Sequence, residues 1–353
     1  MDVKQFSSDK ILGHLDRIKQ WIDTGTAHPV TFELDMTNIC NHSCPYCFGF
    51  YSRNNRESLT LDEAGDIIRQ IKDFGGRGLT FTGGGEPLCN PATVNAVEFA
   101  KGIGLDIGFI TNGILIDEGI AERLIKNCTW IRISLDAASA RMFRITHGMD
   151  TAAFDKVIEN IGLLVEKKKD INGRCTIGVG YLTALESKNE IYKFAKLCQE
   201  MKVDYAQFRP LLPRFGRNKI SYSRTGQSEI IKQIKKSLKL SKDGYQVLYS
   251  KHKYDSMLNG ETQRPYKECF GHHFAAVICA NKKMYICCHF RGVEKYCIGD
   301  LRQMSLKEIW QSRARRKAYE DINLKECIPL CRCNTFNSIL WNIKQEKIHP
   351  NFI

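Results

Sequence analysis

Short β-rich runs alternate with amphipathic stretches over the first 208 residues of the chain. β-Branched and aromatic residues predominate in the runs, whereas the stretches between them repeat apolar residues every three to four positions, as helices do. Alternating strands and helices predict parallel βα units. Right-handed crossovers wind six such units into an α/β fold, a partial (β/α)6 TIM-like barrel with a parallel sheet, whose functional residues belong at the carboxyl ends of the strands. The predicted strands are residues 30–36, 78–82, 105–110, 130–135, 175–182 and 204–208.

The sequence has a different texture on either side of this region. Ile11, Leu15, Ile18 and Ile22 recur at helical spacing and predict an N-terminal helix. After the barrel, charge and then cysteine content rise. The predicted regions are an N-terminal helical extension (1–29), the barrel core (30–208), a basic connector with a helix near 226–240 (209–265) and a small Cys-rich module (266–353).

Two segments of the barrel core have the sequence of a capping box, which marks the start of a helix. They are Thr60-Leu61-Asp62-Glu63 and Ser187-Lys188-Asn189-Glu190. In each, a hydroxyl and a glutamate three residues later can satisfy free backbone N–H groups.

Cysteine usage gives the first chemical indication. The chain has 15 cysteines, and eight of them fall between Cys269 and Cys333. The first residues lack the basic-then-apolar pattern of a secretory signal, and no apolar run approaches the ~18 residues of a membrane span, so we expect a cytoplasmic location with no membrane partner. Thiols stay reduced there, and clustered cysteines indicate metal binding or catalysis rather than disulfides.

Three cysteines lie within eight residues, directly after the first predicted strand: Cys40, Cys44 and Cys47. Three thiolates can hold one iron–sulfur cubane but leave one iron without a protein ligand, so the loop predicts a cluster that binds something else at that iron. Zinc is the alternative. A zinc site usually adds a second Cys pair or a suitably spaced His, and His42 within the loop is poorly placed for that.

The loop resembles the signature of the radical S-adenosylmethionine (SAM) superfamily, C-x₃-C-x₂-C with an aromatic residue before the last Cys, here Tyr46. The resemblance covers roughly residues 30–208. It implies a [4Fe-4S] cluster held by Cys40, Cys44 and Cys47, with SAM bound at the open iron.

Further motifs follow the next strands in the order that this superfamily has. Gly84-Gly85-Glu86, after the second strand, resembles the motif that contacts the SAM amino group, and consecutive glycines let the backbone approach a ligand closely. Thr111 and Asn112 follow the third strand, where a simple turn is an equal alternative.

Ser134 and Asp136 end the fourth strand, where the superfamily binds the SAM ribose; a helix cap is the alternative. Arg144 stands where some relatives carry an arginine for the SAM carboxylate, although a surface arginine is as good an interpretation. The resemblance implies these cofactor-binding residues: Tyr46, Gly84, Gly85, Glu86, Thr111, Asn112, Ser134, Asp136 and Arg144.

The C-terminal cysteines resemble the SPASM and twitch modules that hold auxiliary iron–sulfur clusters. Cys269 and Cys287 are separated by 17 residues, and Cys327, Cys331 and Cys333 follow. The further cysteine run of a full SPASM module is absent. The resemblance implies one auxiliary [4Fe-4S] cluster, ligated by Cys269, Cys287 and two of the other three; a Cys₄ zinc site is the alternative.

Other cysteines receive no ligand role. Cys279, Cys288, His289 and Cys297 lie near the second set, where packing is favoured over the donation of a proton or hydrogen atom. Four more, within predicted core elements, are interpreted as small buried hydrophobes: Cys89, Cys128, Cys175 and Cys198.

Charge bears on partners. Residues 209–253 hold 12 Lys or Arg and 2 Asp or Glu, a net charge of +10 in a chain whose total is +13. We interpret this stretch as a solvated surface or a dock for an acidic electron donor such as flavodoxin or ferredoxin. An anionic small molecule or peptide, contacted by Arg214, Arg217 and Lys219, ranks second, and nucleic acid is unlikely because no recognised module with interleaved aromatics is present.

Three functions remain open. The first is a radical SAM oxidoreductase that abstracts hydrogen from a carbohydrate-like small molecule or a peptide and passes the second electron to an auxiliary cluster. The second is a redox-neutral epimerisation or rearrangement with a Cys such as Cys279 as hydrogen donor. The third, more remote, is a zinc-stabilised nucleic-acid-binding protein without catalysis.

Overall fold

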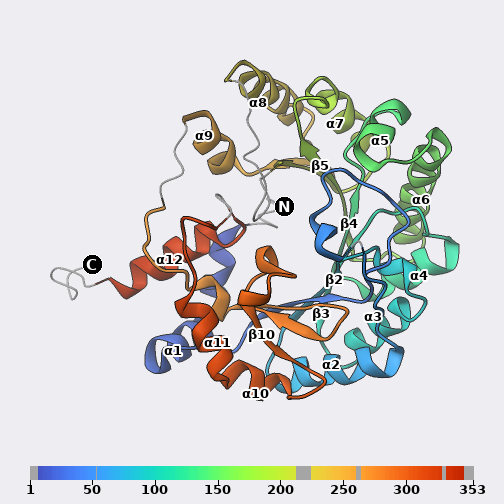
Figure 1. The fold of residues 1–353 in the computed structure, drawn as a ribbon. Coiled ribbons are helices and arrows are strands. Elements are labelled where there is room, and N and C mark those ends of the chain that lie inside the picture. Colours follow the sequence, from blue (N-terminus) through green and yellow to red (C-terminus); the bar gives the residue numbers. More distant parts are fainter. Residues whose placement is uncertain (1–6, 53, 212–223, 260–263, 328–330, 346–353) are drawn as a thin grey trace.

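The six predicted strands form the parallel wall of an open barrel, and the sheet continues beyond them on both sides (Figure 1). The computed structural model describes residues 7–52, 54–211, 224–259, 264–327 and 331–345. Its ten strands follow the order β10-β9-β8-β1-β2-β3-β4-β5-β6-β7. Their bounds are β1 Thr31–Asp35, β2 Gly78–Thr82, β3 Asp106–Thr111, β4 Trp130–Ser134, β5 Thr176–Thr183, β6 Tyr205–Pro210, β7 Gln246–Tyr249, β8 Ala275–Ile278, β9 Lys283–Tyr285 and β10 Cys297–Asp300.

Two of the added strands extend the barrel at its edges. β7 pairs in parallel with β6, although the pattern of residues 209–265 predicted only a loop and a helix there. β8 pairs in parallel with β1, with Thr31 opposite Ala275, and β9 and β10 continue the sheet in antiparallel pairs. The Cys-rich module is therefore hydrogen-bonded to the first strand of the barrel.

Helices cover the outside of the sheet (Figure 1). Their apolar faces pack on the strand residues that point outward, such as Phe32, Ile107, Ile131 and Phe208, in one large buried core. The helix bounds are α1 Leu15–Thr24, α2 Leu61–Asp73, α3 Thr93–Gly102, α4 Glu118–Asn127, α5 Ala140–His147, α6 Thr151–Asp170, α7 Ile191–Glu200, α8 Arg224–Leu238, α9 Lys251–Asn259, α10 Leu306–Gln311, α11 Arg313–Glu320 and α12 Asn334–Lys344.

One predicted capping box is confirmed and the other is wrong. Thr60 and Glu63 cap α2 reciprocally. The Ser187 hydroxyl makes no such cap and instead lies 3.4 Å from the Ala184 carbonyl oxygen, while Glu190 accepts hydrogen bonds from the Ala138 N–H and the Ser139 hydroxyl. A local turn thus takes up the Ser187 side chain, and a tertiary contact takes up that of Glu190.

The two ends of the described chain pack together. Trp21 of α1 contacts Phe270 and Phe274 just before β8, and Leu340 of α12 joins the same buried cluster. The Trp310 indole N–H donates to the Ala27 carbonyl oxygen at 2.9 Å, which ties α10 to the segment before β1. No described helix is both long enough and apolar enough to cross a membrane.

The inner face of the sheet carries polar and charged side chains. Residues alternate between the two faces of a strand. Because Phe32 and Leu34 of β1 belong to the outer core, Glu33 and Asp35 face inward; both are buried, and Asp35 is fully so. By the same alternation Arg132 of β4 lies on the inner side, between the core residues Ile131 and Ile133. The inner face of the barrel is therefore lined by charged side chains and does not form an apolar core.

Candidate active site

The cysteine loop leaves the carboxyl end of β1 and lies against the loop that follows β2. Cys40 is exposed, and Cys44 and Cys47 are half-buried. The His42 N–H lies 3.5 Å from Cys40 Sγ and the Gly49 N–H 3.3 Å from Cys47 Sγ, so backbone donors already face two of the sulfurs. Burial raises the pKa of the half-buried Cys44 thiol. A bound cation such as a cluster iron favours the thiolate form of such a group.

The glycines after β2 allow this loop packing. The Gly85 N–H donates to the Thr37 carbonyl oxygen at 2.9 Å, and a Cβ on Gly85 would overlap the Ile39 carbonyl oxygen. A Cβ on Gly84 would overlap Asn38. Both glycines were predicted to let the backbone approach a ligand; here they let it approach the cysteine loop.

Glu86 ties three loops together at the mouth of the barrel. Its carboxylate accepts hydrogen bonds from the Thr111 hydroxyl at 2.6 Å, the Asn112 N–H at 2.7 Å and the Leu88 N–H at 3.1 Å. The Asn112 side-chain amide donates to Asn41 Oδ1 in the cysteine loop at 2.7 Å. Burial raises the pKa of Glu86. The structure thus brings Glu86, Thr111 and Asn112 together beside the predicted cluster ligands.

Ser134 and Asp136 lie at the end of β4. Asp136 adopts a left-handed backbone conformation, with φ of 50°, and its Oδ1 accepts a hydrogen bond from the Leu182 N–H at 2.6 Å. Burial raises the pKa of Asp136 to about 6, although Arg209 and Arg132 oppose the rise. Within the described residues, a hydrogen bond holds this carboxyl at one of its two oxygens.

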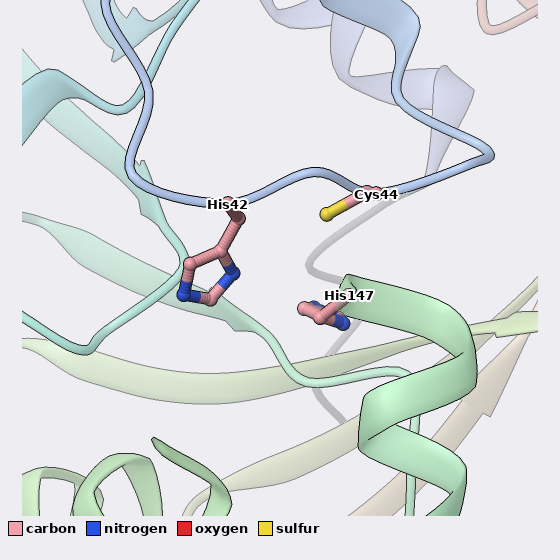
Figure 2. A group of neighbouring side chains, drawn as sticks. All are labelled: His42, Cys44 and His147. Atoms are coloured by element: carbon pink, nitrogen blue, oxygen red, sulfur yellow. The ribbon is translucent and has the colours of Figure 1, made fainter. Parts of the chain in front are cut away.

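A pair of histidines anchors the cysteine loop on α5 (Figure 2). The ligand atoms of His42, Cys44 and His147 lie within 4.8 Å of one another, which is close enough to hold a metal ion. The Ser134 carbonyl accepts from His147 Nε2 at 3.0 Å, and Thr146 Oγ1 lies 3.3 Å from Nδ1, so both ring nitrogens of His147 have neighbours. Burial lowers the pKa of His42 to about 4. We interpret the pair as packing support for the loop.

Two predicted residues lie apart from the others. The Tyr46 hydroxyl donates to Glu186 at 2.8 Å, which links the cysteine loop to the segment after β5. Arg144 is exposed on α5, and within the described residues its side chain contacts none of the predicted SAM-binding groups. Guanidinium groups do lie inside the barrel, but they belong to Arg132 and Arg209.

A buried ion network connects β1 to the Cys-rich module. Glu33 accepts from Arg291 at 2.5 Å and from Arg332, which stands between Cys331 and Cys333. Arg291 also lies 3.2 Å from Asp35, which accepts a 2.8 Å hydrogen bond from the Tyr51 hydroxyl. The sequence pattern gave no sign of this network, because its charges come from residues more than 200 positions apart.

The C-terminal cysteines line one pocket, part of which is open to solvent. Burial, with the neighbouring thiols, raises the pKa of Cys269 to about 12, whereas the neighbouring Cys333 thiol lowers the pKa of Cys331 to about 6. Cys288, interpreted from sequence as packing, lines the cavity with the predicted ligands, and adjacency to Cys287 was the only available signal. The lining thiols are Cys269, Cys287, Cys288, Cys327, Cys331 and Cys333.

His272 also lines this cavity, and one of its ring N–H groups has no acceptor among the described residues. Arg315 lies 3.5 Å from its Nδ1, and since a guanidinium only donates, Nδ1 is the acceptor and Nε2 bears the proton. Nε2 is buried and has no hydrogen-bond partner among the described residues. A buried donor beside six thiols fits a sulfur-rich cluster, whose sulfurs accept hydrogen bonds.

Comparison with known families agrees with this arrangement. Residues 34–197 match the family model of the radical SAM superfamily, and residues 269–334 match that of the SPASM iron–sulfur cluster-binding domain; together the matches cover more than half of the chain. The chain belongs to the radical SAM superfamily. Its cofactors are accordingly a [4Fe-4S] cluster, SAM and an auxiliary iron–sulfur cluster, and both sets of cysteines fit such groups.

Similar radical SAM proteins differ in their named activities. A probable GTP 3′,8-cyclase of Saccharolobus islandicus (strain M.14.25 / Kamchatka #1) is 26% identical over 190 residues, which are 54% of this chain and 59% of that protein. An AdoMet-dependent heme synthase of Methanosarcina barkeri (strain Fusaro / DSM 804) is 23% identical over 333 residues, covering 87% of this chain and 89% of that one. The names thus agree on catalysis but not on a reaction.

Solved structures show the same fold. The structure of Streptococcus suis SuiB bound to precursor peptide SuiA matches with a TM-score of 0.69 at 17% identity. The match covers 90% of this radical SAM chain and 72% of the SuiB chain. The anSMEcpe structure with bound AdoMet has a TM-score of 0.61 at 19% identity, with 83% of both chains covered.

Proposed function

We propose that this protein is a radical SAM oxidoreductase that removes two electrons and two protons from its substrate. When bound, the cluster and SAM supply a 5′-deoxyadenosyl radical that takes one hydrogen atom. The auxiliary cluster, held by the C-terminal cysteines, would supply an acceptor for the remaining electron, and a base would take the remaining proton. The observation that carries the proposal is the second, enclosed set of thiols, attached to the same barrel through β8 and the Glu33 network.

The chain's own residues take up the binding tasks in this proposal. Cys40, Cys44 and Cys47 hold the first cluster. Glu86 provides the acceptor for the SAM amino group, with Thr111 and Asn112 fixing its carboxylate. Asp136, which has one oxygen without a hydrogen bond to the backbone, accepts from the SAM ribose beside Ser134.

The auxiliary cluster takes its ligands from the enclosed thiols. We retain Cys269, Cys287 and two of Cys327, Cys331 and Cys333 as the set. A cubane uses four thiolates, so two of the six lining thiols remain beside it.

The substrate is proposed to be a small molecule or a peptide. The solved SuiB structure has a precursor peptide bound, which supports the peptide class. The reductant is proposed to be an acidic protein such as flavodoxin or ferredoxin, because exposed Lys232, Lys235 and Lys236 give the described part of the connector a basic helix face. Arg214, Arg217 and Lys219 lie outside the described residues. The cytoplasmic location stays a prediction.

The deciding experiment is anaerobic reconstitution followed by iron and sulfide counting, SAM cleavage and product analysis. About eight irons per chain and release of 5′-deoxyadenosine are expected, since two cubanes hold four irons each. Zinc without sulfide would remove both radical functions and leave the remote zinc alternative. A product at the oxidation level of the substrate would contradict the oxidoreductase proposal.

A redox-neutral reaction is the second candidate, and one thiol supports it. Cys279, at the end of β8, is buried with its Sγ 4.0 Å from the Tyr51 hydroxyl. Burial, together with Asp35, keeps the pKa of this thiol well above its ordinary value, so it retains a hydrogen to give. Deuterium from D₂O in a carbon position of the product, lost in Cys279→Ala, is the result that this alternative expects.

A further inference from the structure

We propose that Asn160, a buried residue of α6, is a positioning residue for SAM binding. Its side chain orients the loop after β3, and that loop orients both the Glu86 carboxylate and the cysteine loop. The inference rests on the role proposed above for Glu86 and adds a residue that lies outside the motifs found in the sequence. It concerns the cofactor and does not depend on which substrate the enzyme oxidises.

Asn160 is a polar residue in the apolar face of a helix. Its neighbours on the buried side of α6 are Val157, Ile161 and Leu164, and Asn160 is as fully buried as they are. The Asn160 Oδ1 atom has no hydrogen-bond partner among the described residues. Because an unpaired polar atom in a core is unfavourable, a leucine of similar size would pack there at lower cost, and packing alone does not account for the amide.

The other half of the amide holds a glycine turn. Asn160 Nδ2 donates to the Gly113 carbonyl oxygen at 2.9 Å and to the Ile114 carbonyl oxygen at 3.0 Å. Gly113 has a φ of 82°, and an ideal Cβ there would lie 3.0 Å from the Ile133 side chain, so this turn depends on glycine. Glycine restricts its own backbone less than any other residue, so contacts from outside the turn are needed to fix it.

The peptide plane carries this restraint to Asn112. The Gly113 carbonyl and the Ile114 N–H belong to one planar trans peptide group and point in opposite directions. Holding the carbonyl on Asn160 therefore aims the N–H the other way, where it donates to Asn112 Oδ1 at 3.1 Å. With Oδ1 occupied, the Asn112 side chain presents Nδ2 to Asn41 Oδ1 in the cysteine loop at 2.7 Å.

The same turn fixes the Glu86 carboxylate. The Gly113 N–H donates to Thr111 Oγ1 at 3.0 Å, and that hydroxyl donates to Glu86 at 2.6 Å, so it is oriented from both sides. The Asn112 N–H holds the second carboxylate oxygen at 2.7 Å. Because these groups share one glycine turn, removing the Asn160 amide is expected to loosen all of them together. The SAM amino group then meets a carboxylate that is not held in one orientation.

The test is anaerobic isothermal titration calorimetry of SAM into the reconstituted holoenzyme with oxidised clusters, in which SAM binds without being cleaved. Asn160→Leu should raise the Kd for SAM about tenfold, which equals about 1.4 kcal/mol, the size of one lost hydrogen bond. With reductant added, SAM cleavage at saturating SAM should stay within about threefold of the parent, because the clusters are unchanged. Iron content should match that of the parent.

Leu164→Ala is the matched control, because Leu164 lies one turn along the same buried face and offers no hydrogen bond to the glycine turn. It should lower the free energy of unfolding at least as much as Asn160→Leu and leave the Kd for SAM unchanged. Asn160→Gln keeps the amide donor on a longer side chain and should recover part of the affinity. If Asn160→Leu does not fold, Asn160→Gln decides by the same measurement, with a smaller loss expected.

Several results would overturn the inference. A parental Kd in folded Asn160→Leu would do so, as would an equal rise in Leu164→Ala, which would attribute the effect to stability. Loss of first-cluster iron in Asn160→Leu would assign the residue to the cysteine loop and not to SAM.

Glu86→Gln separates this inference from the role proposed for Glu86. If Glu86→Gln binds SAM as the parent does, that role fails. If Glu86→Gln binds SAM weakly while Asn160→Leu binds it normally, the positioning role of Asn160 alone is refuted. Product analysis, carried out on the same samples, reports separately on the proposed oxidation.

Discussion

The two cysteine sites are built in opposite ways. The first lies on a loop at the barrel mouth, with Cys40 exposed, and its polar neighbours satisfy one another through Glu86, Thr111 and Asn112. The second lines a pocket that is only partly open to solvent, and the Nε2 donor of His272 has no partner among the described residues. An open, pre-arranged site suits a group that must admit and release a ligand. A more covered site with donors facing a sulfur cluster suits electron storage.

The largest expected effect comes from removing the iron–sulfur cluster of the first site while leaving that of the second. Changing Cys40, Cys44 and Cys47 together to alanine should reduce SAM cleavage at least about 1,000-fold, because the cluster iron that binds SAM is lost. Iron should fall by about half, with the auxiliary cluster retained. The measurements are iron content and 5′-deoxyadenosine release.

The complementary variant is Cys287→Ser, which should lose auxiliary iron but still cleave SAM without completing the substrate oxidation. SAM cleavage at the parental rate in the triple-alanine variant would contradict the assignment of the first site. Equal loss of both clusters in both variants would mean that the sites are not independent.

The second prediction concerns the connection between the sites. Glu33→Gln leaves Arg291 without its full counter-charge in a buried position, and removing one partner of a buried ion pair costs about 3 kcal/mol. We expect a corresponding loss in the free energy of unfolding of the holoenzyme in urea. Lys317→Gln, which breaks an exposed pair with Asp321, is the control and should change stability by less than about 0.5 kcal/mol.

A third prediction tests the acid at the first site by pH. The pKa of Asp136 is raised to about 6 in the folded protein, above its unfolded value, so this residue favours folding most at low pH and less as pH rises through 6. Without SAM, Asp136→Asn should therefore gain stability relative to the parent between about pH 4 and 7, by about 3 kcal/mol in total, since one pKa unit corresponds to about 1.4 kcal/mol. Unfolding curves at several pH values measure this difference. A difference that does not vary with pH would show that folding does not shift the pKa of Asp136.

The smallest expected effect concerns the donor at the second site. His272→Phe keeps a ring of similar shape but removes the Nε2 proton, and the loss of one hydrogen bond of about 0.5–1.5 kcal/mol should lower the auxiliary midpoint potential by about 20–60 mV. Redox titration followed by electron paramagnetic resonance measures the shift. His272→Gln should restore part of it.

His273→Phe is the matched control, because His273, like His272, contacts the Tyr319 ring but does not line the cavity. An equal shift in both phenylalanine variants would attribute the effect to packing rather than to hydrogen bonding.

Local sequence pattern was sufficient for the barrel and insufficient for its interior. The six core strands and the α2 capping box follow from residues close in sequence, and both are found. The parallel pairing of β1 with β8 joins residues about 240 positions apart, so periodicity contains no information about it. The position of β7 was missed because the charge of the connector resembled that of a surface loop.

The candidate sites show the same division. Cysteine spacing identified both groups of thiols, because ligands on one loop must be close in sequence. Arg132 was not singled out, since its single charge between two isoleucines looked like ordinary strand alternation. Its nearness to Arg209 depends on how β4, β5 and β6 meet in space. The exposure of Arg144 is likewise a matter of how α5 rotates on the barrel, which a sequence motif does not specify.

The pairing of β8 with β1 limits how the chain can be divided. A fragment that stopped in the connector would leave the backbone N–H and C=O groups along one side of β1 open, and an unprotected edge strand invites pairing with another molecule. Such a fragment is expected to self-associate even if every barrel residue is present. A C-terminal module could therefore be exchanged between relatives only if the exchanged segment includes β8, the strand that pairs with β1.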